Sequence, residues 1–151
     1  MHASMTHTMS RSMTAALIGA SLAVGIAASA RANVITDWDE KAVAVATPIG
    51  TYPARRVMAM VHVAMFDATN SIAQRYRPYL VQLPAAPTTS KEAAAAAAAG
   101  TILATIDPKT AAEMKVAIVT YLASVPDGEA KSDGIKLGEA VAARVLEARG
   151  E

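Results

Sequence analysis

The stretch that decides the fold is TSKEAAAAAAAGTILATI, residues 89–106. Its seven consecutive alanines, residues 93–99, have the highest helix propensity of any side chain. Thr89 and Glu92 have the spacing of a capping box, which predicts that a helix begins just before the alanines. Gly100 interrupts this helix without ending it, because the apolar pattern continues beyond it. Alanine side chains let neighbouring backbones approach closely, so we expect this helix to lie between other helices.

Two helices are predicted before the alanine helix. The first begins at Asp37, an N-cap with Glu40 as its capping-box partner, and ends before a proline. The second has Pro53 in its first turn, and from residue 57 to residue 66 its only polar residue is His62. An apolar run on all sides of a helix is typical of burial on several sides. A buried strand is the alternative for this run.

The remainder of the chain predicts an extended segment and two more helices. Residues 73–89 contain three prolines and form a strap. Asp107 caps the next helix, with Pro108 at its first position, and a last helix spans about residues 133–148. The fold class is therefore all-α, a compact bundle of about five helices. The apolar second helix and the alanine helix both need close neighbours, so we expect an incomplete half of a larger helical fold.

Residues 1–32 have the three parts of an export signal. A polar segment with a basic end precedes an uncharged run at residues 12–30, and small-residue cleavage sites end at Ala30 and Ala32. This pattern predicts an exported protein, periplasmic or extracellular, whose helical domain is residues 33–151. A retained membrane anchor is the alternative, because the uncharged run is just long enough to span a bilayer.

Composition excludes several classes of function. The 151 residues include 14 Lys and Arg, 13 Asp and Glu, and no cysteine. The absence of cysteine excludes a disulfide scaffold, a zinc site with Cys ligands and a Cys nucleophile. The balanced charge argues against a strongly basic nucleic-acid-binding protein, and a hydrophobic fraction of 53% argues against disorder.

Few residues after the export signal could carry chemistry. Motifs for phosphate loops, dinucleotide binding, nucleophile elbows and helical zinc sites are absent from the sequence. His62 is the only histidine beyond residue 32, and we expect a core or interface histidine hydrogen-bonded to a neighbour, with a ligand or base as the alternative. Asp67 lies on a different helix face from His62, so no metal site is predicted. Asp67 and Asn70 share a face and are expected to tie the helix end to neighbouring backbone.

The main basic concentration comprises Arg55, Arg56, Arg75 and Arg77. Anion binding is one hypothesis, because arginine matches phosphate geometry. The favoured interpretation is a solvated face, or structural pairing with Asp67. Tyr76 and Tyr79 flank Arg77 and Pro78, and we expect their rings to pin the strap to the domain. Base stacking is the alternative for these rings, although no nucleic-acid partner is predicted.

The order of several blocks resembles a known family. Ala54 and Arg55 lead into MVHVAMFDATN at residues 60–70, and YRPY follows at residues 76–79. The alanine helix comes next, and the pattern GxxxGxxVA at residues 134–142 runs into Arg149. These blocks resemble the N-terminal helical region of exported bacterial vanadium-dependent haloperoxidase-like proteins, which are relatives of the type-2 phosphatidic-acid phosphatases. The resemblance covers nearly all of the chain after the export signal.

The resemblance implies that the catalytic residues lie outside this chain. In the family, three downstream blocks, K-x6-R-P, P-S-G-H and S-R-x5-H, surround a vanadate or phosphate. None of them occurs here, and Arg77-Pro78 has Asn70 where the first block requires lysine. No catalytic, cofactor-binding or metal-binding residue is therefore assigned. His62, Asp67, Asn70, Arg55 and Arg77 are expected to support the fold, and vanadate is implied only for an intact relative.

Two functions are predicted from these observations. The first is the non-catalytic N-terminal helical half of an exported haloperoxidase-like or acid-phosphatase-like protein. Its intact form would oxidise halide with peroxide or hydrolyse phosphate esters, and its partner is the missing C-terminal catalytic half. The alternative is a self-sufficient exported interaction module, such as a homodimer that buries its apolar helix against a second copy. A membrane partner is expected only if the export signal is retained.

Overall fold

The computed structural model describes residues 33–150, which fold into five α-helices and, within that range, no β-strand. The helices are α1 (Val34–Ala46), α2 (Thr51–Ala73), α3 (Lys91–Ile106), α4 (Ala111–Leu122) and α5 (Glu129–Arg149), with a short 3-10 turn at Thr47–Ile49. The predicted all-α class and the bundle of about five helices are confirmed. The predicted export signal and its cleavage sites lie outside the described residues. No helix within residues 33–150 combines the length and the apolarity needed to cross a membrane.

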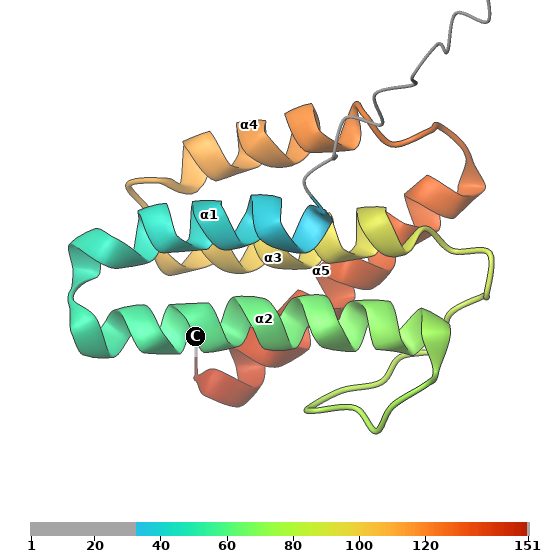
Figure 1. The fold of residues 1–151 in the computed structure, drawn as a ribbon, viewed down its shortest axis with the longest axis horizontal. Helices are drawn as coiled ribbons and strands as arrows, with labels where there is room; N and C mark the ends of the chain where they lie inside the picture. The colour runs from blue at the N-terminus through green and yellow to red at the C-terminus, as the bar shows by residue number, and fades with distance from the viewer. Residues whose placement is uncertain (1–32, 151) are drawn as a thin grey trace, which may run out of the picture. The chain divides into compact units, whose positions relative to one another are not determined.

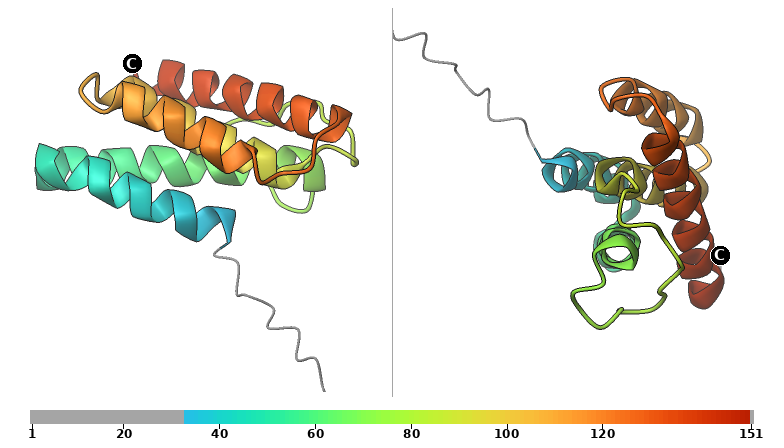
Figure 2. Two further views of the ribbon diagram at one scale, coloured as in Figure 1. Left: turned by 90° about the horizontal axis from the view of Figure 1, so that it is seen from above. Right: turned by 90° about the vertical axis from the view of Figure 1, so that its right-hand side faces the viewer.

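The alanine helix α3 lies at the centre of the bundle. It packs against α1, α2, α4 and α5 (Figure 1), and α4 packs mainly on α3, with a ring contact from its Tyr121 to Trp38 of α1 at 6.1 Å between ring centres. The chain reverses after the 3-10 turn, so α1 and α2 run side by side, and α5 crosses behind α2 and α3 (Figure 2). The expectation that the alanine helix lies between other helices is confirmed.

Backbones touch directly where α5 crosses α3. Residues 93–100 of α3 are buried, and Ala93, Ala94, Ala97 and Ala98 among them face Gly134 and Gly138 of α5. A Cβ atom added at Gly138 would lie 2.3 Å from the carbonyl oxygen of Ala94 and 2.8 Å from the amide nitrogen of Ala98. Only glycine therefore allows this separation of the two helices.

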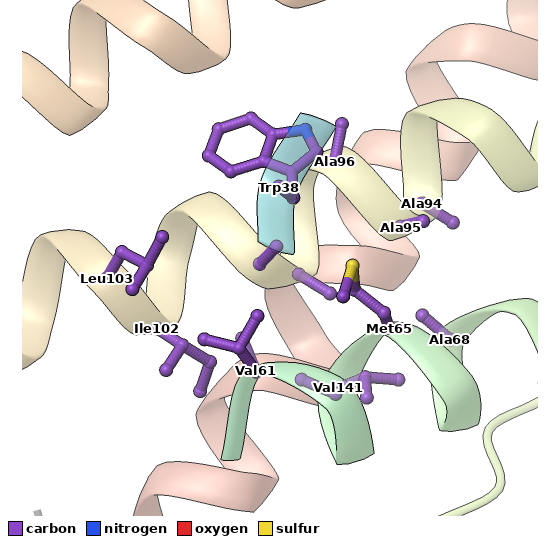
Figure 3. Packing of buried hydrophobic residues seen from close by; sticks show 14 of the residues in the cluster. Trp38, Val61, Met65, Ala68, Ala94, Ala95, Ala96, Ile102, Leu103 and Val141 are labelled. Atoms are coloured by element: carbon purple, nitrogen blue, oxygen red, sulfur yellow. The ribbon is translucent and has the colours of Figure 1, made fainter. Parts of the chain in front are cut away.

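Larger side chains fill the space on the other side of α3. Met65 and Ala68 of α2 lie on the side of the alanines and Val61 lies beside Ile102, while Trp38 of α1 covers α3 from another direction (Figure 3). Val57, Met60 and Ala64 of α2 are buried as well. α2 is thus buried where it meets α1, α3 and α5, which confirms burial on several sides. Its outward stripe, which includes Ala59, His62 and Phe66, stays exposed.

At the starts of α1 and α3, the residue that caps the helix differs from the predicted one. α1 is capped by Asn33, whose side-chain oxygen accepts a hydrogen bond from the Ile35 amide at 3.1 Å, and not by Asp37. α3 is capped by Ser90, whose hydroxyl accepts from the Ala93 amide at 3.1 Å, and not by Thr89. Asn, Asp, Ser and Thr have similar N-cap preferences, so the sequence does not separate Thr89 from Ser90, or Asp37 from Asn33 one turn before it.

The starts of α4 and α5 also differ from prediction. Asp107 and Pro108 form a turn before α4, in which the Asp107 carboxylate accepts from the Lys109 amide at 3.0 Å. α4 itself begins at Ala111, because this local side-chain bond competes with helical hydrogen bonding. α5 begins at Glu129, directly after Gly128, four residues before the predicted start.

Candidate functional site

Three of the four buried polar side chains in the described residues lie near the C-terminal end of α2. Asp67, Asn70 and Ser71 are all within 3% of complete burial. Their spacing of three and four residues places them on one helix face, which the strap covers. The strap occupies residues 74–90 and begins at Gln74, a left-handed residue whose amide donates to the Asn70 carbonyl at 2.7 Å.

Asp67 binds three consecutive backbone amides of the strap. One carboxylate oxygen accepts from Tyr79 at 2.8 Å, and the other accepts from Leu80 at 2.8 Å and Val81 at 2.9 Å. Hydrogen bonds to a charged acceptor are stronger than neutral ones, so this carboxylate is a firm anchor. A buried carboxylate with three amide donors is held in place and is not presented to a substrate.

Asn70 and Ser71 anchor the strap on either side of this contact. The Asn70 amide donates to the Tyr76 carbonyl at 2.8 Å, and its oxygen accepts from the Tyr76 amide at 3.0 Å. The Ser71 hydroxyl accepts from the Leu83 amide at 3.1 Å. The prediction that Asp67 and Asn70 tie the helix end to neighbouring backbone is confirmed. Ser71 was missed, although it lies one turn after Asp67 on the same face.

His62 is hydrogen-bonded as predicted, but it is not in the core. Its Nε2 lies 2.9 Å from an Oδ1 of Asp39 on α1, and the two side chains are 46% and 42% exposed. Of the two predicted locations, the core is wrong, because His62 lies on the outward stripe of α2, and the interface stays a prediction. Among residues 33–150 no group of three or more His, Asp or Glu side chains is arranged to hold a metal ion.

The four arginines do not form one cluster. Arg55 and Arg56 lie near the start of α2, while Arg75 and Arg77 follow its end, about 25 Å away by the rise of the helix. Arg56 donates a hydrogen bond to the carbonyl of Arg149 at the end of α5, and the guanidinium of Arg55 lies 6.0 Å from the ring centre of Tyr52. A vanadate or phosphate needs several donors that converge, and these arginines diverge. The residues of this chain therefore do not fit an oxyanion site built from them.

The predicted pairing of these arginines with Asp67 is wrong. The carboxylate of Asp67 is fully buried and already accepts from three strap amides, whereas Arg75 and Arg77 are exposed. The prediction of a solvated face is the one that fits these side chains.

The tyrosine rings of the strap are mostly exposed and contribute little to holding it on the domain. Tyr76 and Tyr79 are 68% and 67% exposed, and the Tyr76 ring lies beside the exposed ring of Phe66, with centres 6.2 Å apart. The prediction failed because the backbone of the strap, and not its rings, makes the anchoring contacts. The strap is therefore held by its backbone on the side that faces α2, while its tyrosine side chains are exposed to solvent.

An open cleft of about 450 Å³ lies between the end of the strap and α5. Its walls are largely apolar, with Leu83, Ala85 and Leu137 among them, and Asp133 and Lys136 lie at its edge. These two charges lie 3.5 Å apart and interact with each other. Comparison of the chain with models of protein families, with curated proteins and with solved structures finds no match.

Proposed function

We propose that residues 33–150 are the non-catalytic helical half of an exported haloperoxidase-like or acid-phosphatase-like protein. In this proposal a second helical half supplies the groups that bind the oxyanion and do the chemistry. Vanadate, if the intact protein uses it, would be held by that second half. The resemblance of residues 60–70 to the family supports the proposal, and the exposure of α4 is the observation that carries it.

The outer face of α4 exposes two valines among polar side chains that include Glu113 and Lys115. Val116 and Val119 are 65% and 70% exposed, on a helix that packs mainly on α3 and reaches α1 through Tyr121 and Trp38. An open cleft of about 490 Å³ continues this face and includes Leu122 and Lys131 in its walls. Contiguous exposed apolar side chains of this kind mark interaction surfaces. A further layer of helices on α4 would bury them as α3 buries the opposite side.

The role of the family-like block in this proposal is structural. Asp67 and Asn70 lie within residues 60–70, and all of their hydrogen bonds to the strap go to backbone groups. They fix the shape of the surface that the strap presents. The reaction itself would depend on the second half.

The first experiment is to read the genomic sequence beyond codon 151 in all three frames. We expect K-x6-R-P, P-S-G-H and S-R-x5-H in that order, in the same frame or in a neighbouring one. Unrelated sequence there would favour the self-sufficient module, such as a homodimer. Sedimentation of the purified chain would then test for a compact dimer.

The second experiment combines the chain with its catalytic half. The chain alone should neither oxidise bromide with peroxide and vanadate nor release phosphate from esters, whereas the two halves should co-elute and be active. Replacing both Val116 and Val119 with serine should weaken this association. Val43→Ser on α1, 47% exposed in the wild type, is the control that should leave the association unchanged. Activity of the chain alone would overturn the proposal.

A further inference from the structure

The strap loop, residues 75–80, gathers exposed aromatic, apolar and cationic side chains on a fixed backbone. Tyr76 and Tyr79 are about two-thirds exposed, and Leu80 is 41% exposed. Phe66 of α2 lies against Tyr76 and is 39% exposed. Four of the eight large hydrophobic side chains that are exposed in the described residues thus lie in and beside this one loop.

The charge of this loop has one sign. Arg75 and Arg77 are exposed, and residues 74–90 contain no aspartate or glutamate. Asp67, the acid that bonds the amides of this loop, is buried on the inner side of the strap. The outer surface of the loop therefore offers positive charge together with tyrosine and leucine.

The backbone of the loop is already ordered. Tyr76, Tyr79 and Leu80 each donate their amide to a buried side chain of α2 at 2.8–3.0 Å. A rigid loop loses little conformational entropy when it binds, so its exposed side chains are available at low cost. The loop also projects beyond α2 on the side away from α4 (Figure 2, right), which separates it from the surface proposed for the catalytic half.

We propose that the strap loop, together with Phe66, docks the protein onto an anionic lipid surface. Tyrosine rings favour the membrane interface, where the ring is embedded and the hydroxyl stays hydrated. Arginines beside them are attracted to acidic headgroups. The tyrosines and Leu80 would enter the headgroup region, and Arg75 and Arg77 would remain among the phosphates.

An acidic protein is the competing partner, and the size of the surface disfavours it. A stable protein interface uses about 20–30 residues on each side, whereas the loop and Phe66 offer a handful of side chains on a convex projection. A fluid lipid surface adapts to a convex loop and needs no complementary pocket. The observations therefore favour a lipid surface over a shaped protein site.

The test uses the full chain and vesicles of equimolar phosphatidylglycerol and phosphatidylcholine. Arg75→Gln with Arg77→Gln should weaken binding about 30-fold, because each arginine contributes about fivefold near an anionic surface. Tyr76→Ser with Tyr79→Ser should weaken binding about tenfold. The matched control replaces Lys109, Lys115, Val116 and Val119 on and before α4 with glutamine or serine and should bind as the wild type does.

All of these substitutions fall on exposed side chains, so the fold should be retained, which circular dichroism checks. Residues 1–32 are identical in every variant, so the differences report on the loop. Equal binding by the loop variants and the wild type, or an equal loss in the α4 control, would overturn the proposal. So would binding to poly-L-glutamate through the same residues with no binding to vesicles, which would indicate an acidic protein partner.

A second measurement reports on insertion directly. The chain has no cysteine, so Tyr79→Cys and Val116→Cys each give one site for an environment-sensitive fluorophore. We expect a blue shift of the emission at position 79 when phosphatidylglycerol vesicles are added, and none at position 116. No response at position 79, or the same response at both positions, would contradict the proposal.

Discussion

The contact between α3 and α5 and the contact between α2 and the strap are both closely packed, but different groups hold them. Where α5 crosses α3, the backbones meet at Gly134 and Gly138, whose nearest neighbours are backbone and Cβ atoms of residues 90–98. Where the strap crosses α2, the side chains of Asp67, Asn70 and Ser71 reach backbone groups of the strap. The contact between α3 and α5 depends on the absence of a Cβ atom at the two glycines, whereas the contact between α2 and the strap depends on polar side-chain atoms. Adding an atom tests the first, and removing atoms tests the second.

Gly138→Ala should produce the largest effect. The added Cβ would overlap backbone atoms of Ala94 and Ala98 on a helix that has neighbours on several sides. We expect a loss of about 3 kcal/mol in the free energy of unfolding, at the upper end of the usual cost of overpacking. Urea denaturation followed by circular dichroism would measure it. Alanine has a higher helix propensity than glycine by about 1 kcal/mol, so propensity alone predicts the opposite sign.

Gly100→Ala is the matched control for this substitution. A Cβ at Gly100 would meet the side chain of Ile118 at 2.2 Å and that of Trp38 at 2.9 Å, and no backbone atom is among its three nearest neighbours. Side chains can shift more readily than a backbone, although Ile118 is β-branched and Trp38 is fully buried, so we expect a smaller loss than at Gly138, about 1–2 kcal/mol. Equal losses at both positions would show that the backbone contact is not what limits α5.

Asp67→Ala should produce the next largest effect. It leaves the amides of Tyr79, Leu80 and Val81 without their acceptor, and we expect a loss of about 2–3 kcal/mol in unfolding free energy. Hydrogen exchange should show these three amides exchanging faster, while amides of α3 change only with global stability. Asp39→Ala, which removes an exposed carboxylate, is the control. Unchanged protection of the strap amides would contradict the anchoring role of Asp67.

Part of this comparison was readable in the sequence. The small side chains of seven consecutive alanines let neighbouring helices approach closely, so the central position of α3 could be predicted from residues 93–99. The shared face of Asp67 and Asn70 likewise follows from their spacing, and the proline-bounded strap supplied the backbone that they bind. Both predictions use only local geometry and residue size.

The parts that failed depend on how distant segments meet. Asp39 was not recognised as the partner of His62, because that contact requires the register of α1 against α2. Tyr76 and Tyr79 are exposed because α2 holds the strap by its backbone groups. The spacing of residues in the sequence does not show whether backbone or side-chain groups make these contacts. The sequence pattern of α2 also did not reveal which of its apolar sides would remain in water.

The pair of His62 and Asp39 offers an exposed counterpart to the buried anchor at Asp67. Both side chains are more than two-fifths exposed, so the pair loses little solvation and gains little attraction. A double-mutant cycle with His62→Ala and Asp39→Ala should give a coupling of about 0.5 kcal/mol or less. A coupling several times larger would mean that this pair, and not only the strap anchors, fixes α1 on α2.

The smallest expected effect concerns Asp127, just before α5, whose exposed carboxylate pairs with the mostly buried Lys131 in the first turn of α5. Lys131 is 16% exposed and donates to the Asp127 carboxylate at 2.9 Å and to the Val125 carbonyl at 3.2 Å. This hydrogen bond, together with the positive charge of Lys131, lowers the pKa of Asp127 below its usual range. A carboxyl whose pKa is lower in the folded state stabilises the fold above its unfolded pKa, and loses that contribution as the pH falls through the folded value.

The window for this loss therefore lies below about pH 4. The difference in unfolding free energy between the wild type and Asp127→Asn should be constant from neutral pH down to about pH 5 and shrink below about pH 4. Lys131→Met should remove this pH dependence, because it removes the group that lowers the pKa. A difference between wild type and Asp127→Asn that stays constant through the acid range would show that the ion pair makes no contribution. In that case the fold would depend on the strap anchors and the glycine contact, and the pair of Asp127 and Lys131 would add nothing to its stability.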